Sequence, residues 1–180
     1  MVYMFLADGF EEIEALAVVD ILRRGGVEIK TVSINGSLNV QGAHNICVKS
    51  DMTDSEIGND VNCVILPGGL PGTTNLSKSS VVEKTVKECY KSGGIIGAIC
   101  AAPSVFYKYG LLDGKKATAY PGYDEEMPKC NYTGSDVETD GNIITSKGAG
   151  TAHLFGFELL KHLKNEEIAY EIKKAMQYRN

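Results

Sequence analysis

Four short segments of almost uninterrupted apolar residues recur along the chain, bounded by Gly, Pro or Asp. They are VYMFLA at 2–7, VNCVILP at 61–67, GGIIGAIC at 93–100 and NIITS at 142–146. Strands buried on both faces of a parallel sheet have this continuous apolar character, whereas half-exposed strands alternate apolar and polar residues. The pattern therefore predicts buried strands at these four places.

Segments with a helical spacing of apolar residues lie between and after these runs. The predicted helices cover residues 10–24, 81–90, 101–109, 151–163 and 166–178. Gly25 and Gly26 are expected to end the first helix. Ser80 and Glu83 are expected to form a capping box at the start of the second helix.

Strand and helix alternate along most of the chain, an order typical of parallel strands joined by right-handed crossovers. We expect an α/β fold with three layers, in which helices cover both faces of a mostly parallel central sheet. Residues 1–180 are expected to form a single domain. The segment 37–48 and the turn at 140–142 are predicted to add hairpins to the sheet.

The net charge bears on the class of partner. The 180 residues include 18 Lys and Arg against 23 Asp and Glu, a formal net charge of -5. This is the wrong sign for nonspecific binding to nucleic acid or to an anionic membrane surface, so neither partner is expected. The continuous apolar runs are far shorter than the roughly 18 residues that indicate a membrane-spanning helix, and the uncharged stretches 61–77 and 92–107 contain Gly and Pro.

The cysteines predict free thiols in a reducing compartment. They are Cys47, Cys63, Cys89, Cys100 and Cys130. Their number is odd, they form no close pairs, and the chain starts without a basic targeting segment, so we expect a cytoplasmic protein. No Cys or His spacing matches a zinc or iron site, and no metal is expected.

Glycines gather at the ends of the predicted strands. Ligands of open parallel sheets bind outside the carboxyl ends of the strands, so function is expected there. The acids Glu11, Glu12 and Glu14 follow the first apolar run, residues 67–69 follow the second, and Cys100 follows the third.

Cys100 has the sequence context of a nucleophile elbow. It lies between a buried strand and a helix and is flanked by the small residues Ala98, Ala101 and Ala102. A tight elbow requires small neighbours, projects the nucleophile above the sheet and points the next N–H at a developing oxyanion. The helix N-terminus is expected to lower the pKa of the thiol. An inert buried thiol is the alternative interpretation.

A reactive thiol needs a group that handles protons, and Glu14 is the candidate. Glu14 is predicted to face inward with Ile13, whereas Glu11 and Glu12 have more exposed helical phases. A carboxyl group beside a thiolate has its pKa raised by like charge and desolvation, so the pair is expected to share a proton. The alternative is that these acids only complement the helix dipole.

Gly68 and Gly69 are candidate oxyanion donors, because glycine lets a substrate approach the backbone closely. An ordinary turn is the alternative. No glycine pattern has the spacing of a P-loop or a dinucleotide site, so no cofactor is expected. His153 and His162 are interpreted as surface or packing residues.

Four motifs occur together in the chain: DGFEEIEA at 8–15, LPGG at 66–69, AICAAP at 98–103 and GAGT at 148–151. In this order and spacing they resemble the ThiJ/PfpI family, in the branch of the parkinsonism-associated deglycase DJ-one. The resemblance implies a flavodoxin-like sandwich and a homodimer. It also implies a reactive Cys100, a protonated Glu14 hydrogen-bonded to it, and an oxyanion site made by the N–H groups of Gly69 and Ala101.

Two positions depart from the pattern of this branch. Tyr120 stands where a histidine above the cysteine is frequent, and is expected to line the substrate site. His44 stands where an arginine reaches the site from the dimer partner. A tyrosine can donate a hydrogen bond, but its ordinary pKa of about 10 makes it a poor base.

The resemblance implies a stress-protection enzyme of the glutathione-independent glyoxalase or protein deglycase type, a lyase or hydrolase. Its substrates would be reactive 2-oxoaldehydes such as methylglyoxal, or glycated adducts, with Cys100 as nucleophile and Glu14 as acid/base. An alternative is a non-enzymatic oxidative-stress sensor or redox-regulated chaperone that uses an oxidisable Cys100. The sequence leaves both open.

Overall fold

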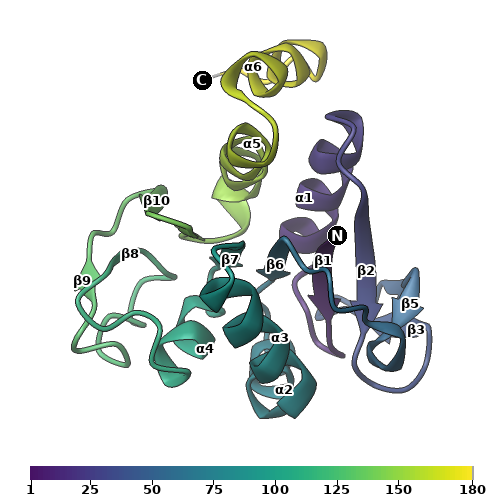
Figure 1. Cartoon of the computed structure of the whole chain (residues 1–180), viewed down its shortest axis with the longest axis vertical. Helices are drawn as coiled ribbons and strands as arrows, with labels where there is room; N and C mark the ends of the chain where they lie inside the picture. Colours follow the sequence, from purple (N-terminus) through teal and green to yellow (C-terminus); the bar gives the residue numbers. More distant parts are fainter. Residues whose placement is uncertain (180) are drawn as a thin grey trace.

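A seven-stranded sheet runs through the computed structural model, which describes residues 1–179 (Figure 1). Its strands lie in the order β10-β11-β7-β6-β1-β2-β5. They are β1 (Val2–Leu6), β2 (Ile29–Ser33), β5 (Met52–Thr53), β6 (Cys63–Leu66), β7 (Ile95–Ile99), β10 (Val137–Asp140) and β11 (Ile143–Ser146). Neighbouring strands are parallel except that β10 runs antiparallel to β11.

The four strands predicted from apolar runs are confirmed as β1, β6, β7 and β11, with ends one or two residues shorter. The turn at 140–142 joins β10 to β11 and adds a hairpin to the sheet edge, as predicted. The segment 37–48 contributes instead to a separate two-stranded sheet of β3 (Asn39–Gln41) and β4 (Cys47–Lys49), so that prediction is wrong. β8 (Lys116–Ala117) and β9 (Asn131–Tyr132) form another small parallel pair.

Helices cover both faces of the sheet (Figure 1). One face carries α1 (Glu12–Arg24) and α5 (Ala152–Leu163), with α6 (Glu166–Ala175) packed on α5, and the other carries α2 (Gly72–Lys78), α3 (Ser80–Lys91) and α4 (Pro103–Lys108). The 3-10 turns η1 (Asp54–Glu56) and η2 (Ala149–Thr151) precede β6 and α5. The expected flavodoxin-like three-layer arrangement is therefore confirmed.

Four helix starts differ from the predictions; among them, α4 begins two residues late, at Pro103, and α5 one residue late, at Ala152. The first helix begins at Glu12 and not at residue 10. The second begins one residue earlier than predicted, and its cap is Ser79: the hydroxyl oxygen of Ser79 accepts a 3.3 Å hydrogen bond from the N–H of Val82. The predicted capping box with Ser80 is wrong, and Glu83 instead pairs with Lys87 one turn later.

Strand β1 divides the apolar core into two layers. Val2, Met4 and Leu6 contact the cluster beneath α1 and α5, whereas Tyr3 and Phe5 contact the cluster beneath the other three helices. Alternation of side chains along a strand explains this division. Both faces are apolar because both are covered, which is why the strand reads as one continuous apolar run.

The helices α1 and α5 approach each other closely. A Cβ added at Gly156 would lie 2.7 Å from Cδ1 of Ile21, so this position on α5 has no room for a side chain. The buried face of α1 is formed by Ala15, Val18, Ile21 and Leu22. Within residues 1–179, no helix has the length and apolar character needed to cross a membrane.

Leu22→Ala is expected to lower the free energy of unfolding by about 2–5 kcal/mol, because Leu22 is fully buried and its loss leaves a cavity. Leu38→Ala, at a leucine that is 37% exposed, is expected to cost less than about 1 kcal/mol. Urea unfolding of both variants measures the difference. Equal losses would contradict the assignment of Leu22 to the core.

Candidate active site

Three adjacent parallel strands bring the predicted site residues together. β7, β6 and β1 are neighbours in the sheet, and their carboxyl ends lead to Cys100, Gly68 and the start of α1. The N–H of Glu11 donates a 2.9 Å hydrogen bond to the carbonyl oxygen of Gly68, which ties the loop after β1 to the loop after β6. Glu14, distant from Cys100 in sequence, therefore lies beside it.

Cys100 occupies the left-handed backbone region with φ of 64°, which is uncommon for a residue with a side chain. Its N–H donates to the carbonyl oxygen of Ser146 at 2.9 Å, and its own carbonyl oxygen accepts from the N–H of Tyr120 at 2.8 Å. The Ser146 hydroxyl is in turn 2.7 Å from the hydroxyl of Thr151, in the GAGT motif. Neighbouring segments thus hold the strained turn in place, and the local geometry is that of an elbow.

Glu14 is almost completely buried, with 1% of its surface exposed. Its Oε2 accepts a 2.8 Å hydrogen bond from the N–H of Gly68, and its Oε1 is buried without a hydrogen-bond partner. Burial raises the pKa of Glu14 to about 7, partly offset by the hydrogen bonds from Gly68 and Cys100, and the charge of Glu11 raises it further. The carboxyl group is therefore poised to hold or release a proton near neutral pH.

The predicted inward direction of Glu14 is confirmed, but the reasoning from helical phase is wrong. Ile13 is 54% exposed, and Glu12 is buried. Glu12 is buried because the loop between β3 and β4 covers it: Oε1 of Glu12 accepts a 2.7 Å hydrogen bond from the N–H of His44. Helix periodicity does not reveal such a loop.

The backbone of Gly68 lies against both the carboxyl group of Glu14 and the side chain of Cys100, and no side chain stands between them. A Cβ at Gly68 would lie 2.6 Å from Cβ of Cys100 and 2.7 Å from Oε2 of Glu14. Any side chain at position 68 would displace one of the two groups. The N–H of Gly68 is occupied by Glu14, so Gly69 and not Gly68 remains available to an oxyanion.

The prediction that the thiol pKa of Cys100 is lowered is wrong. Burial, the charge of Glu14 and the hydrogen bond to Glu14 raise the pKa of Cys100 to about 12, whereas the N–H groups of Ala101 and Gly69 act in the opposite direction. The helix after the elbow begins only at Pro103 and has six residues, so its dipole contributes little at the sulfur.

The two shifted pKa values describe one coupled pair. Because two negative charges so close together are costly, Glu14 and Cys100 lose one proton near pH 7 and keep the second until much higher pH. The sulfur carries the negative charge whenever the remaining proton is on Glu14. The N–H groups of Gly69 and Ala101, which reach the sulfur, favour that arrangement.

Tyr120 is held at the site by its backbone, while its side chain is 53% exposed and packs against Gly148. A second tyrosine, Tyr123, was not singled out from the sequence. Burial raises the pKa of Tyr123, with smaller contributions from the charges of Glu126 and Cys100, so its hydroxyl lies within electrostatic range of the thiol. Both tyrosines lie in the segment ATAYPGYDE. This segment has no regular apolar pattern, so the sequence does not predict which tyrosine turns inward.

His44 contacts residues of its own chain. Its Nδ1 lies 2.9 Å from Oε2 of Glu12 and 3.4 Å from Oε2 of Glu11, and the hydrogen bond to Glu12 is the largest cause that raises the pKa of His44. Ligand atoms of these three residues lie within 4.8 Å of one another, so this is where a metal ion could be held among the described residues. The sequence showed no such spacing because the residues come from two separate segments. The hydrogen bonds already satisfy Glu12, and the cluster fastens the β3–β4 loop to α1.

Two other cysteines behave as packing residues. Cys63 and Cys89 are buried, and burial raises the thiol pKa of both, to about 11 for Cys89.

His153 stacks on Tyr178 with ring centroids 5.7 Å apart, and Nδ1 of His162 lies 2.9 Å from the carbonyl oxygen of Glu158. Neither histidine belongs to the Cys100 site.

Comparisons with known proteins agree on one family. Residues 1–162 match the DJ-1/PfpI family. Protein DJ-1 homolog B of Arabidopsis thaliana is 38% identical over 177 residues, which are 97% of this chain but only 40% of that relative. The Caenorhabditis elegans protein named glutathione-independent glyoxalase DJR-1.2 is 31% identical over 169 residues, 92% of this chain and 89% of that relative.

Solved structures agree in fold. The crystal structure of Drosophila melanogaster DJ-1beta has a TM-score of 0.95 and 33% identity, covering 99% of this chain and 98% of that chain. A structure of Toxoplasma gondii DJ-1 described as oxidized has a TM-score of 0.92 and 33% identity, with coverage of 99% and 98%. The sequence motifs, the fold and the matched length together show that this chain belongs to the DJ-1/PfpI family.

Proposed function

We propose that the chain is a cysteine-dependent stress-protection enzyme that converts reactive 2-oxoaldehydes to 2-hydroxy acids without glutathione. The observation that carries the proposal is the buried Glu14 carboxyl, with a pKa of about 7, beside the Cys100 thiol on a strained elbow. The name of the nematode relative, a glutathione-independent glyoxalase, supports the same reaction class.

The first step uses the sulfur of Cys100 as nucleophile. With the shared proton on Glu14, the thiolate attacks the aldehyde carbon, a C–S bond forms, and the carbonyl electron pair moves to oxygen. The N–H groups of Gly69 and Ala101, which point at the sulfur, are placed to stabilise an oxyanion on the carbon bound to it. Glu14 gives its proton to that oxygen, which yields a hemithioacetal and leaves Glu14 as a carboxylate.

The second step moves a proton between neighbouring carbons. The Glu14 carboxylate removes the hydrogen of the hemithioacetal carbon as a proton, and the electron pair of that bond forms a C=C bond while the carbonyl pair of the ketone moves to its oxygen. The proton of the hemithioacetal hydroxyl passes to that oxygen and Glu14 returns its proton to the adjacent carbon, so that the former ketone becomes an alcohol and the hemithioacetal becomes a thioester. Water then cleaves the thioester and releases the hydroxy acid and the thiol. The net reaction is addition of one water, with no external oxidant or reductant.

The same site suits adducts in which a 2-oxoaldehyde has already condensed with a protein amine or thiol. Such an adduct either releases the 2-oxoaldehyde or presents its former aldehyde carbon to Cys100. Deglycase activity therefore uses Cys100 and Glu14 as well. Tyr120 and Tyr123, at the edge of the site, offer hydroxyl donors to the second oxygen of the substrate.

A second function remains tied to Cys100: oxidative-stress sensing or redox-regulated chaperone action. The structure of the Toxoplasma relative described as oxidized favours keeping this alternative. The partly exposed thiol of Cys100 contrasts with the fully buried Cys63, so an oxidant has access to it.

We also propose that two copies of the chain associate through the first helix. The apolar residues Tyr3, Met4 and Val18 of β1 and α1 supply no surface for such a contact, because all three are buried in the core. Other apolar side chains are exposed on this side: Ile13 and Leu16 of α1, and Ile46 in the β3–β4 loop. The loop lies on α1, because the N–H of Ile46 is 3.5 Å from Oε1 of Glu12.

Cys100→Ala is expected to abolish conversion of methylglyoxal to lactate, because it removes the thiol that lies beside the buried Glu14 carboxyl group. Cys130→Ala is the matched control, since Cys130 is also partly buried but lies away from Glu14, and it should retain activity. Product formation by the purified proteins measures this. Equal slow consumption by wild type and Cys100→Ala would sink the enzyme proposal and leave the sensor.

Glu14→Gln is expected to keep the fold but reduce kcat by roughly 100-fold to 10,000-fold, because an amide donates a hydrogen bond but carries no proton between carbons. Glu11→Gln, one position before α1, should stay within a few-fold of wild type. Steady-state kinetics with methylglyoxal compare the two. Similar activity in both variants would reduce Glu14 to a helix-dipole residue.

The stability of the wild type should fall as pH rises from about 4.5 to 7. The pKa of Glu14 is about 7 in the folded chain against an ordinary 4.5, so the folded state binds more protons in this window and loses its advantage as pH increases. Relative to Glu14→Gln, the free energy of unfolding of the wild type should fall by up to about 3 kcal/mol over this pH range. Urea unfolding at pH 4 and pH 8 measures this, and a pH-independent difference would contradict the raised pKa.

Light scattering at micromolar concentration should give twice the 19.4 kDa chain mass. Ile13→Lys should shift the population toward the monomer, because it places a charge in the contact. Tyr170→Lys, at a 63% exposed residue of α6, should not. A wild-type monomer, or equal effects of both variants, would reject the proposed contact.

A further inference from the structure

Two backbone hydrogen bonds hold Cys100 in its left-handed conformation. The N–H of Cys100 donates to the carbonyl oxygen of Ser146 at 2.9 Å, and the N–H of Tyr120 donates to the carbonyl oxygen of Cys100 at 2.8 Å. Ser146 is the last residue of β11, so the chain leaves the sheet directly after it. The loop that follows, residues 147–151, is therefore the next segment that can fix this strand end.

The hydroxyl of Thr151 is the centre of the hydrogen bonding in this loop. Its Oγ1 lies 2.7 Å from Oγ of Ser146 and accepts a 3.1 Å hydrogen bond from the N–H of Gly148. The N–H of Thr151 donates to the carbonyl oxygen of Gly148 at 2.8 Å, so both backbone polar groups of Gly148 are held. The hydroxyl of Ser146 donates to the carbonyl oxygen of Asp136 at 2.8 Å, and its oxygen can accept from the hydroxyl of Thr151.

Gly148 connects the loop to the second partner of Cys100. The ring of Tyr120 lies against Gly148, since a Cβ added at Gly148 would be 3.5 Å from Cδ2 of Tyr120. The ring thus rests on a backbone that Thr151 fixes, while the N–H of Tyr120 holds the carbonyl group of Cys100. One hydroxyl group is therefore linked to both hydrogen bonds of the strained residue.

We propose that Thr151 is a positioning residue, whose hydroxyl holds the strained turn that presents the sulfur of Cys100 to the oxyanion site. A residue with a side chain keeps a left-handed conformation only where its surroundings fix it. Loss of a hydroxyl that fixes two neighbours of Cys100 therefore lets the turn relax. The inference concerns the reactivity of the thiol, and it rests on the proposed function only where turnover of methylglyoxal is measured.

A relaxed turn has a defined effect on the sulfur. The N–H groups of Gly69 and Ala101 reach the sulfur of Cys100 and favour its ionised form. A sulfur that moves away from them is ionised at higher pH and reacts more slowly at neutral pH, because the thiolate is the nucleophile. Removal of the Thr151 hydroxyl deletes no contact with the substrate, so the loss should fall on kcat and not on KM.

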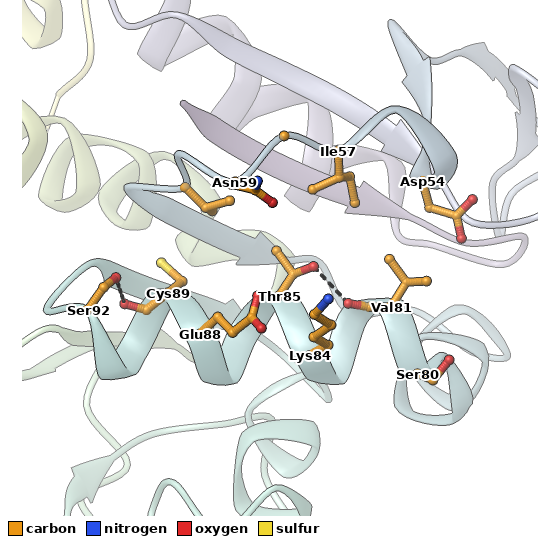
Figure 2. A pocket seen from close by; sticks show the side chains of 12 residues that line it. Asp54, Ile57, Asn59, Ser80, Val81, Lys84, Thr85, Glu88, Cys89 and Ser92 are labelled. Atoms are coloured by element: carbon orange, nitrogen blue, oxygen red, sulfur yellow. Dashed lines mark hydrogen bonds between the residues drawn. The ribbon is translucent and has the colours of Figure 1, made fainter.

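Thr85 offers a matched control in a different part of the fold (Figure 2). It is buried on α3, and its hydroxyl donates a 2.8 Å hydrogen bond to the carbonyl oxygen of Val81. The groove that Thr85 lines, of about 740 Å³, contains no residue of the Cys100 site. Thr85→Val therefore removes one threonine hydroxyl and one hydrogen bond without touching either backbone partner of Cys100.

The rate of Cys100 alkylation by iodoacetamide, followed by peptide mass spectrometry as a function of pH, measures the reactivity of this thiol. Thr151→Val removes the hydroxyl at nearly constant volume. It should move the first step, near pH 7 in the wild type, to higher pH and lower the rate at pH 7 about fivefold, which corresponds to one neutral hydrogen bond. The kcat for methylglyoxal should fall by about the same factor, with KM within twofold of the wild type.

Three further variants complete the experiment. Thr151→Ser retains the hydroxyl and should restore the wild-type values, and Thr85→Val should match the wild type. Ser146→Ala removes the other hydroxyl of the pair and should shift the alkylation profile in the same direction as Thr151→Val, so it serves in place of Thr151→Val if that variant does not fold. Thermal unfolding of each variant establishes that folded proteins are compared.

The outcomes separate the role of Thr151 from the reaction. A wild-type alkylation profile in Thr151→Val, or in Ser146→Ala where it is used instead, would overturn the assignment. So would a Thr151→Ser variant that behaves like Thr151→Val, or an equal shift in Thr85→Val. Failure of the wild type to convert methylglyoxal would overturn the proposed function, and the alkylation profiles would still decide the role of Thr151.

Discussion

One buried space under Gly68 holds both a carboxyl group and a thiol, and the chemistry of the site depends on it. Glu14 and Cys100 are too close, and too far from solvent, to be ionised together. The pair therefore keeps one proton over a wide pH range. A side chain at Gly68 would separate or displace the two groups, so a glycine at this position is a geometric requirement.

The order of the sheet creates that space. Parallel β1, β6 and β7 are adjacent, so the loops after them meet although they are far apart in sequence. The strained turn at Cys100 persists because Ser146 and Tyr120 hold its backbone from both sides. In this way the apolar packing on both faces of the sheet positions Glu14 beside the strained Cys100, where few water molecules reach either residue.

Features that depend on local pattern were predicted well from the sequence. Continuous apolar runs located four central strands, and small residues around Cys100 located the elbow. β2 was missed because its sequence, IKTVS, mixes polar and apolar residues. The sequence places the cap of α3 one residue late. Ser79 and Ser80 are equally good cap candidates in sequence, and only the backbone conformation at the start of the helix distinguishes them.

Features that depend on long-range contacts were not predictable in this way. The β3–β4 loop buries Glu12 and leaves Ile13 exposed, which reverses the expected helical phase. The thiol pKa of Cys100 depends on burial and on Glu14, both set by the tertiary fold, and the short α4 does not supply the expected dipole.

The shared proton of Glu14 and Cys100 is the central claim, and the pH dependence of Cys100 alkylation tests it most directly. Wild type should show two steps in rate, one near pH 7 where the pair loses its first proton and another far above pH 9, whereas Glu14→Gln should show one step. A single wild-type step at the ordinary cysteine pKa of about 8.5, unchanged in Glu14→Gln, would contradict the account.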